Sequence, residues 1–445
     1  MNQSLKKLFF LLGDIVVLHL ALALTLFVRY RLLGDINGIS PHWQAHWYYF
    51  IGVFIIFLLV FYINNLYSLR QMASERNFIR HTLSSVIVAS LLAIVYFYIY
   101  PQVDIAPKTN LAIFAVIALI GFLIWRKLSY LLLKSSAWQN NLAIIGYNEK
   151  IKVLLEDMSN RPGLGYQTAL IFKDMSELNE LKQNILDRNI RTVILGDDFG
   201  ANTALRQVLF NLLRHKISFI SFENFYEQVN GKVPVENINQ NWFLENLAEG
   251  EKNYFDFAKK LFDYFLATLL LLISLPFWPL IALVIKLGSY GPIFFDQVRV
   301  GKNGRLFKLY KFRSMRVKNN NDDITTTNDR RITLNGRFLR STRLDEIPQL
   351  INILKGQMSF IGPRPERPEL SEKLESIIPF YTTRLLIKPG LSGWDQISGE
   401  YHSANADDTL KKLQNDLYYI KHRSIYLDTS ITLKTIATVL GGRGM

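Results

Sequence analysis

The chain has 445 residues, a formal net charge of +14 and a composition that is 49% hydrophobic. This length favours two or three domains, and the excess of Lys and Arg favours an anionic partner, such as nucleic acid, anionic lipid or a phosphorylated substrate, over a merely solubilising charge. The absence of cysteine excludes disulfides, thiolate metal sites and a cysteine nucleophile.

Four long apolar runs fill the first third of the chain, and each can cross a hydrocarbon core of about 30 Å as a helix. Tyr and Trp cluster near the ends of the runs, as in an interfacial belt, and most of the flanking Lys and Arg lie on one side, which places both ends of the block in the cytoplasm. The runs cover roughly 8–30, 47–67, 81–101 and 109–131. We therefore expect a four-helix transmembrane domain over residues 1–140.

Two polar residues, Asp14 and His19, interrupt the first apolar run. An ionisable residue inside a membrane can mark a transport pathway. A polar contact between helices, or a purely local role, is the favoured interpretation here. Arg126 belongs to the basic group that marks the cytoplasmic end of the fourth run.

The middle of the chain alternates strand-like and helix-like segments, which indicates a small Rossmann-like parallel α/β domain over 141–245. A dinucleotide site needs a Gly-x-Gly-x-x-Gly turn after the first strand. Only Gly146 stands in that place, so the backbone cannot approach a pyrophosphate closely. The pattern favours a structural or regulatory domain.

A fifth apolar run, at 261–288, carries Pro276 and Pro279 at its centre and basic residues on both flanks. Proline removes a backbone donor and clashes with the preceding turn, so a break near Ser274 and Pro276 is expected. Basic residues at both ends disfavour passage to the other side. We expect a re-entrant membrane helix over 258–288, with a kinked full span as the alternative.

Basic residues dominate the segment 296–345. The stretch "FKLYKFR" (307–313) alternates apolar and basic positions, as a half-exposed strand does. The polar stretch 317–330 predicts a loop. A nucleic acid is one possible partner, but no nucleic-acid motif is visible, and the neighbouring membrane run and acidic pair favour a diphosphate substrate.

The acidic pair Asp345-Glu346 interrupts this basic segment within "RLDEIPQ". Asp345 suits a helix N-cap, and Gly356 suits the helix end. A helix N-terminus lowers carboxylate pKa values, so both side chains are expected to be ionised. One carboxylate can attack phosphorus while the other helps to hold Mg²⁺, or the pair can merely begin a helix.

Several ordered stretches of the last third resemble the bacterial polyprenyl-phosphate hexose-1-phosphate transferases, the large monotopic phosphoglycosyl transferases that initiate exopolysaccharide, capsule or O-antigen units. They are "GPIFFDQVRVGKNGRLFKLYKFRSM", "RRITLNGRFLRSTRLDEIPQLINILKGQMSFIGPRPE", "KPGLSGWDQISG" and "DLYYIKHRSIYLD". The four spans and the α/β domain also match the layout of the large subgroup. The fold implied is a four-helix bundle, a Rossmann-like domain and a mainly α monotopic catalytic domain over 250–445.

The resemblance implies that Asp345 attacks the sugar-linked phosphate of a UDP-sugar and releases UMP. Undecaprenyl phosphate then takes the phosphosugar, on the cytoplasmic face of the inner membrane. Glu346 matches the residue assigned to Mg²⁺, with Asp345 beside it. The resemblance also supplies positions that line the phosphate site or have less certain roles: Arg299, Lys311, Arg313, Arg340, Asn352, Arg364 and Gln396.

Two acidic residues, Asp395 and Glu400, depart from the family pattern and put sugar and nucleotide contacts in that loop in doubt. The sequence does not name the sugar. A homodimer is possible, and a catalytically inactive membrane scaffold of a polysaccharide assembly complex is the alternative function. Binding of nucleic acid is not expected.

Overall fold

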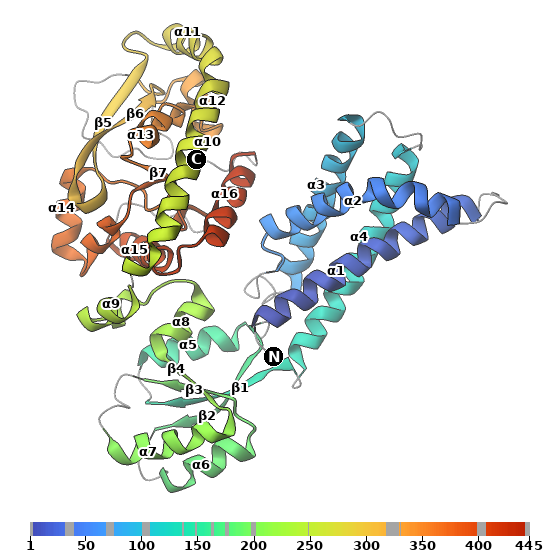
Figure 1. Cartoon of the computed structure of the whole chain (residues 1–445), viewed down its shortest axis with the longest axis vertical. Helices are drawn as coiled ribbons and strands as arrows, with labels where there is room; N and C mark the ends of the chain where they lie inside the picture. The colour runs from blue at the N-terminus through green and yellow to red at the C-terminus, as the bar shows by residue number, and fades with distance from the viewer. Residues whose placement is uncertain are drawn as a thin grey trace. The chain divides into compact units, whose positions relative to one another are not determined.

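The computed structural model describes residues 3–31, 40–67, 75–99, 107–135, 138–146, 149–161, 164–173, 178–196, 202–247, 249–316, 329, 331–397 and 406–440. The chain forms two compact units, Met1–Val229 and Asn230–Met445 (Figure 1). The described part contains five helical segments that are long and apolar enough to span a membrane. Four of them lie in the first unit and one in the second.

The first unit begins with four long helices, as the apolar runs predict. A π-helical turn, Phe27–Arg31, follows the first of them. Phenylalanines from different helices interlock at the centre, where the Phe61 and Phe122 ring centroids lie 4.7 Å apart. Leu20, Leu91 and Ile124 are each more than half exposed on the outside, where lipid would cover them. The helices are α1 (Gln3–Leu26), α2 (Ser40–Ile63), α3 (Glu75–Ile99) and α4 (Pro107–Lys134).

The two polar residues of the first apolar run make different contacts. Asp14 Oδ2 lies 2.6 Å from Arg126 Nη2 on α4, and both side chains are fully buried. His19 Nδ1 lies 2.8 Å from the Ile15 carbonyl oxygen, one turn earlier on the same helix. Asp14 therefore joins two helices and His19 acts locally. Arg126, which belongs to the basic group at the end of the fourth run, is fully buried, and its guanidinium lies over the Phe61 and Phe78 rings.

The α/β part of the first unit is a four-stranded parallel sheet in the order β2-β1-β3-β4. Its strands are β1 (Asn140–Ile145), β2 (Tyr166–Phe172), β3 (Thr192–Leu195) and β4 (Ser218–Ser221). Its helices are α5 (Glu149–Ser159), α6 (Leu178–Asp187), α7 (Thr203–Leu212) and α8 (Phe222–Asn230). Gly146 has φ = +82°, the tight turn expected directly after the first strand. Its chain neighbours 147 and 148 lie outside the described residues.

The second unit begins earlier than the sequence suggested. Residues 230–245, which we placed with the α/β domain, pack instead with the C-terminal part of the chain. Val233, Val235 and Trp242 share an apolar cluster with Leu374 and Leu417. The helix of this segment is α9 (Gln240–Asn246).

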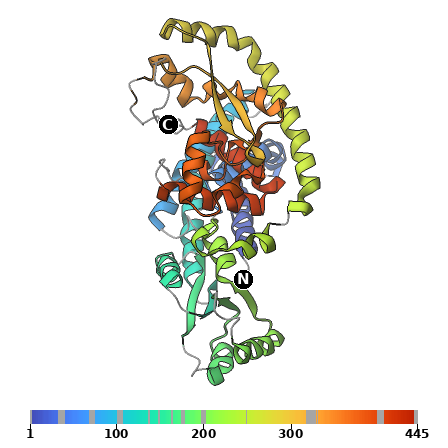
Figure 2. The ribbon, with the colours of Figure 1, turned by 90° about the vertical axis from the view of Figure 1, so that its left-hand side faces the viewer.

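The fifth apolar run forms two helices joined by a short 3₁₀ turn at Leu275–Phe277. They are α10 (Asn253–Ser274) and α11 (Trp278–Gly288). Figure 2 shows the change of direction between them at the end of α10. The break therefore falls at Ser274 and Pro276, as expected from the proline, which cannot donate the backbone hydrogen bond of a continuing helix.

The rest of the second unit packs against one side of these two helices with short elements. It contains two two-stranded sheets, the antiparallel hairpin β5–β6 and the parallel pair β7–β8, together with helices. The strands are β5 (Phe294–Val300), β6 (Leu306–Phe312), β7 (Ser359–Ile361) and β8 (Gly390–Ser392). The helices are α12 (Leu334–Ser341), α13 (Gln349–Leu354), α14 (Pro368–Ile377), α15 (Ala406–His422) and α16 (Ile425–Leu440).

Both arms of the broken helix pack on this body. Ala267 and Leu271 of α10 join an apolar cluster with Ile353 of α13. Ile281 and Ile285 of α11 join a second cluster with Phe312 and Leu339. Ile347 belongs to both clusters, so the residue directly after the acidic pair is held between the two arms.

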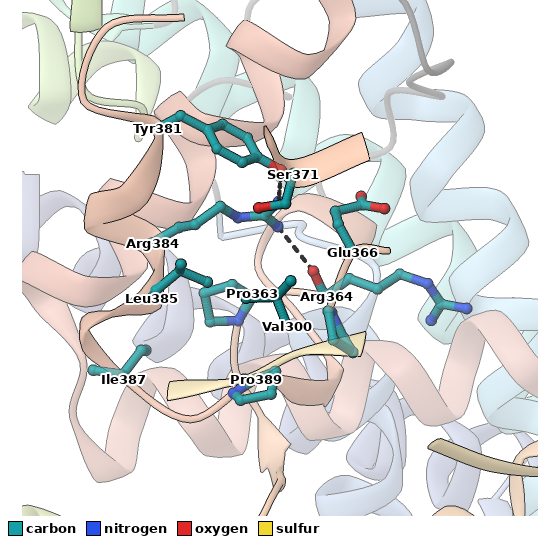
Figure 3. Close-up of a pocket in the computed structure, with 12 residues that line it drawn as sticks. Val300, Pro363, Arg364, Glu366, Ser371, Tyr381, Arg384, Leu385, Ile387 and Pro389 are labelled. Carbon is teal, nitrogen blue, oxygen red and sulfur yellow. Dashed lines mark hydrogen bonds between the residues drawn. The ribbon is translucent and has the colours of Figure 1, made fainter. Parts of the chain in front are cut away.

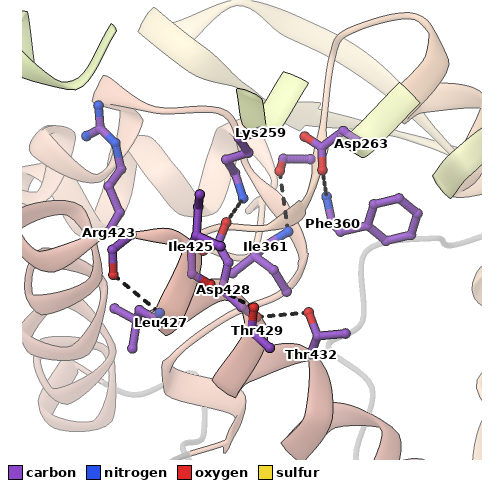
Figure 4. Close-up of polar contacts among 12 residues, drawn as sticks. Lys259, Asp263, Phe360, Ile361, Arg423, Ile425, Leu427, Asp428, Thr429 and Thr432 are labelled. Atoms are coloured by element: carbon purple, nitrogen blue, oxygen red, sulfur yellow. Dashed lines mark hydrogen bonds and ion pairs between the residues drawn. The ribbon is translucent and has the colours of Figure 1, made fainter. Parts of the chain in front are cut away.

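Polar contacts fix the N-terminal arm further (Figure 4). Lys259 pairs with Asp428 of α16. The Phe360 amide of β7 donates to Asp263 Oδ1 at 3.2 Å. The outward side of the arm is apolar and open, with Phe265, Leu272 and Ile273 each more than half exposed.

Candidate active site

The acidic pair lies in a single 3₁₀ turn, Leu344–Glu346, between α12 and α13. Arg343 precedes the turn with φ = +57°, a left-handed conformation that reverses the chain direction at the end of α12. Both carboxylate side chains are buried. The prediction that Asp345 is the N-cap of the next helix was wrong, because that helix begins at Gln349 and Pro348 occupies its N-cap position without a side-chain hydrogen bond.

Three cations converge on Glu346. Lys311 Nζ, from β6, and Arg364 Nη2 lie 2.8 Å and 3.0 Å from Glu346 Oε1. Arg343 Nη1 lies 3.6 Å from Glu346 Oε2. These charges hold the pKa of Glu346 well below its usual range, although burial alone would raise it.

Asp345 has a different environment from its neighbour. Its Oδ1 atom is buried and has no hydrogen-bond partner among the described residues. Burial raises the pKa of Asp345 above the ordinary aspartate value, against the opposing effect of Lys311, while the Glu346 charge raises it further. The expectation that a helix N-terminus lowers both pKa values is therefore wrong for Asp345, since the turn is too short to supply a helix end and desolvation dominates.

Two arginines with unequal exposure complete the cationic side. Arg364 comes from the Pro-Arg-Pro turn after β7, and its side chain is 42% exposed. Arg340, on α12, opposes the raised pKa of Asp345 electrostatically. Its Nη1 atom is buried without a hydrogen-bond partner among the described residues.

Three other residues assigned to the phosphate site hold backbone instead. Arg313 donates to the Ser289 and Tyr290 carbonyl oxygens at 2.7 and 3.0 Å, where α11 ends. Arg299 donates to the Pro365 carbonyl oxygen at 3.0 Å and to Gln297. Gln396 Oε1 accepts from the Gly393 amide at 3.0 Å within its own loop. Their roles in binding phosphate stay predictions.

Asn352, on α13, is fully buried and joins the helix to the hairpin. It accepts from the Tyr310 amide at 3.1 Å and donates to the Lys308 carbonyl oxygen at 2.7 Å, across β6. A third bond, of 2.8 Å, reaches Gln357 Oε1. These contacts fix the distance between Lys311 on the strand and Glu346 before the helix.

Replacing Asn352 by Ala is expected to destabilise the protein by about 2–4 kcal/mol, because buried backbone donors and acceptors of β6 would lose their partner. The change would be measured by denaturant unfolding in detergent. Asn241→Ala, at an exposed position of α9, is the matched control. A loss no larger than that of the control would contradict the structural assignment.

The break of the membrane run has its own hydrogen bonds. Ser274 Oγ donates to the Leu271 carbonyl oxygen at 3.0 Å and accepts from Trp278 Nε1 at 3.3 Å. Trp278 packs on Phe312 with ring centroids 5.2 Å apart. Ser274 and Pro276 thus shape the run and do not contact the acidic pair.

Two acidic residues, Asp395 and Glu400, depart from the family pattern, and the structure describes the first of them. Asp395 Oδ1 accepts from Asn415 Nδ2 at 2.9 Å and so faces α15. Glu400 lies outside the described residues, as do residues 317–328 of the predicted loop.

Sequence reasoning missed a buried ion pair behind the Pro-Arg-Pro turn. Arg384 Nη2 lies 2.8 Å from Asp416 Oδ2, and both side chains are about 5% exposed. Burial raises the pKa of Asp416 to about 7, although Arg384 opposes the shift. Asp416 stands in the quoted stretch "DLYYIKHRSIYLD", so a signal was present. Its partner Arg384 lies 32 residues away in a stretch that carries no motif.

A magnesium ion fits one of the two carboxylates better than the other. Asp345 Oδ1 is a buried oxygen that meets no hydrogen-bond donor within the described ranges, whereas both Glu346 oxygens already face cations. The described residues contain no group of three His, Asp or Glu that could hold a metal by themselves. Mg²⁺ commonly takes one or two carboxylates and completes its shell with substrate phosphates and water.

Comparison with known proteins supports the resemblance to bacterial sugar transferases that the sequence motifs indicate. A family model described as "Bacterial sugar transferase" matches residues 254–442. A second, described as "CoA-binding domain", matches residues 62–186, which include the later membrane helices and half of the parallel sheet.

Three similar proteins have names that state an activity. A UDP-N-acetylgalactosamine-undecaprenyl-phosphate N-acetylgalactosaminephosphotransferase from Aeromonas hydrophila is 40% identical over 49% of this chain and 51% of its own length. UDP-glucose:undecaprenyl-phosphate glucose-1-phosphate transferases from Xanthomonas campestris pv. campestris and Escherichia coli (strain K12) are 33% and 32% identical. Those alignments cover 67% and 65% of this chain and 66% and 68% of the relatives. The chain thus spans between about half and two thirds of these relatives.

The buried carboxylate pair, its cations and the broken apolar helix all lie within the matched region. The chain belongs to the bacterial sugar transferase family.

Proposed function

We propose that this protein transfers a sugar 1-phosphate from a UDP-sugar to undecaprenyl phosphate, releasing UMP, as the first membrane step of exopolysaccharide, capsule or O-antigen synthesis. The observation that carries the proposal is Asp345 Oδ1, a buried carboxylate oxygen beside a cluster of cations, which has no hydrogen-bond partner in the described part of the chain. The names of the relatives supply undecaprenyl phosphate and the nucleotide sugar. The inactive scaffold is not favoured, because the relatives compared above are named as transferases.

The proposed reaction has two displacements at one phosphorus. Asp345 Oδ1 attacks the sugar-bearing phosphorus of the UDP-sugar, the bond from that phosphorus to the bridging oxygen breaks, and UMP leaves with the electron pair. An oxygen of undecaprenyl phosphate then attacks the same phosphorus and displaces Asp345, which regains its charge. The product is undecaprenyl-diphosphate-sugar. No proton transfer is required when undecaprenyl phosphate attacks as a dianion and UMP leaves as a dianion.

The cations have separate roles in this proposal. Arg364 is half-exposed and can meet the diphosphate, while Lys311 and Arg343 neutralise Glu346 and keep it in place. Mg²⁺ would supply further neutralisation when bound, and Asp345 would hold it more readily than Glu346, whose oxygens already face cations. This Mg²⁺ requirement is part of the proposal.

The function is tested with purified protein, undecaprenyl phosphate, Mg²⁺ and a panel of UDP-sugars, with UMP release as the readout. Glucose, galactose and N-acetylated hexoses belong in the panel, since the site does not name the sugar. Release of UMP from at least one donor is expected. No release from any donor would favour the scaffold.

We also propose that α10 and α11 enter and leave the bilayer on the same, cytoplasmic side of the inner membrane. Both arms pack on one soluble body and meet at Ile347, which supports a re-entrant helix better than a full span. A nucleotide sugar from water and a lipid phosphate would then meet at the membrane surface. A homodimer and a regulatory role for the α/β domain stay predictions.

Single cysteines placed at the two ends of the run test this topology, because the chain has none of its own. Tyr254 and Tyr290 are 91% and 100% exposed and flank the run. Both Tyr254→Cys and Tyr290→Cys are expected to resist an impermeant thiol reagent in intact cells and to react after permeabilisation. A cysteine between residues 32 and 39, expected outside, is the positive control. Labelling of position 290 from outside would establish a full span.

The acid limb of the pH profile is expected to depend on Lys311. Asp345 must be ionised to attack, so activity falls as the pH drops through its pKa, and Lys311 is the strongest influence that lowers this pKa. Lys311→Gln should move the midpoint of the acid limb of kcat/KM upward by about one pH unit. Lys308→Gln, whose lysine pairs with the exposed Asp296, is the control. An unmoved midpoint would contradict the electrostatic role.

A further inference from the structure

The Pro-Arg-Pro turn presents four consecutive carbonyl groups, and each accepts a hydrogen bond. Pro363 O accepts from the Gly390 amide and Glu366 O from the Val300 amide, both at 2.9 Å. Between them, the Arg364 and Pro365 carbonyls accept from arginine side chains. These are Arg384 Nη2 at 2.9 Å and Arg299 Nη1 at 3.0 Å.

The Arg384 guanidinium is itself held from three directions, of which Figure 3 shows the two toward Tyr381 and Arg364. Its Nη1 atom donates to Tyr381 Oη at 2.7 Å, and its Nη2 atom donates to the Arg364 carbonyl oxygen. Asp416, from α15, lies against the same Nη2 atom. Tyr381 is 1% exposed and Arg384 is 5% exposed, so no part of this arrangement lies open to substrate.

A buried ion pair is a costly way to obtain stability. Two charges lose their hydration, and apolar residues of similar volume often stabilise a fold as well or better. What a guanidinium adds is direction, because its planar donors fix the positions of the acceptors that they meet. Here the acceptor is the backbone of the residue whose side chain reaches Glu346, next to Asp345.

We propose that Arg384 and Asp416 are positioning residues for Arg364: the buried pair holds the Arg364 backbone so that its guanidinium lies beside the acidic pair. Asp416 orients Arg384, Arg384 holds the Arg364 carbonyl, and the Arg364 side chain reaches out from that fixed backbone. The two flanking prolines restrict the remaining backbone freedom. The role of Arg364 toward a diphosphate rests on the proposed function, whereas the positioning itself does not.

The main test compares Asp416→Asn with Asp256→Asn. Asp256 also pairs with a buried arginine of the same unit, Arg423, at 3.1 Å, but it does not touch the turn. Asp416→Asn is expected to lower kcat for UMP release by about 10–100-fold with little change in KM, since small misplacement of a charge-stabilising group costs this much. Asp256→Asn should stay within about threefold of the wild type. Equal effects of the two variants would overturn the proposal.

A double-variant comparison separates positioning from general damage. In an Arg364→Ala background the positioned side chain is absent, so Asp416→Asn should lower kcat by less than about threefold more. A full multiplicative loss would show that Asp416 acts through something other than Arg364. Where Asp416→Asn gives little folded protein, Tyr381→Phe removes only one bond to Arg384. It should lower kcat by about 3–10-fold, and wild-type kcat in this variant would also count against the proposal.

Hydrogen exchange gives a readout that needs no activity. Peptides that cover 359–366 should exchange their amide hydrogens faster in Asp416→Asn than in the wild type. Their exchange rate in Asp256→Asn should equal that of the wild type. If the wild type releases no UMP from any donor, the proposed function fails while this measurement still decides the positioning. Unchanged exchange over 359–366 in Asp416→Asn would overturn it.

Discussion

Asp345→Asn is expected to abolish both UMP release and the covalent phosphosugar, with a loss in kcat of at least about 10⁴-fold. The amide keeps the size and shape of the side chain but is not a nucleophile. The intermediate would be sought by intact-protein mass after mixing with a UDP-sugar and no undecaprenyl phosphate. Asp296→Asn, at an exposed ion pair of β5, is the control for the same chemical change.

Stability separates the loss of chemistry from the loss of fold in this variant. Burial raises the pKa of Asp345 in the folded state, so its ionisation above the unfolded pKa weighs against folding at neutral pH. Asp345→Asn removes that cost, and its melting temperature at pH 7 should equal or exceed that of the wild type. A covalent phosphosugar in the variant would refute Asp345 as the nucleophile, and a large fall in melting temperature would refute the electrostatic argument.

Glu346→Gln should lower kcat by about 10²–10³-fold, because Lys311 and Arg364 lose the charge that holds them. It should also destabilise the protein by about 1–3 kcal/mol, less than the loss from a fully buried ion pair, because Arg343 and Arg364 are 34% and 42% exposed. The pKa of Glu346 is lowered on folding, so its stabilising contribution is present at neutral pH and is lost only as the pH falls toward its folded pKa. Glu375→Gln, on the exposed side of α14, is the matched control.

Titration with Mg²⁺ distinguishes the two roles of Glu346. If it mainly anchors the cations, kcat falls while the half-saturating Mg²⁺ concentration is unchanged. If it mainly holds the metal, that concentration rises. Stability and kcat close to those of the control would contradict both roles.

Much of the fold follows from periodicity and punctuation in the sequence. The four apolar runs, the strand at 306–312 and the break at Pro276 depend on local patterns, and the structure has each of them. The partner strand β5 was not predicted. Its residues were used only as part of a family motif, and their pattern of apolar and polar residues was not taken as a strand. The start of the second unit was also placed too late, because Val233 and Val235 pack with residues more than a hundred positions away.

The candidate site also has features that the sequence predicted and features that only the folded chain defines. The motifs assigned Lys311, Glu346 and Arg364 to one site, and in the structure Lys311 and Arg364 both pair with Glu346. What the motifs do not record is where each donor points. Arg299 and Arg313 hold carbonyl oxygens of neighbouring turns, a contact set by backbone positions that only the folded chain defines. The opposite pKa shifts of two adjacent carboxylates have the same origin, because they depend on which one faces the cations.

The ion pair between Asp14 and Arg126 has a consequence for biogenesis. The two residues are 112 positions apart in the chain. At about 5–20 residues per second, translation needs roughly 6–20 s to deliver the arginine after the aspartate has left the ribosome. A central aspartate costs a single inserted helix about 2.5–3.5 kcal/mol. Until the fourth helix has been made, Asp14 has no Arg126 to pair with, so this ion pair forms only once both helices are in place.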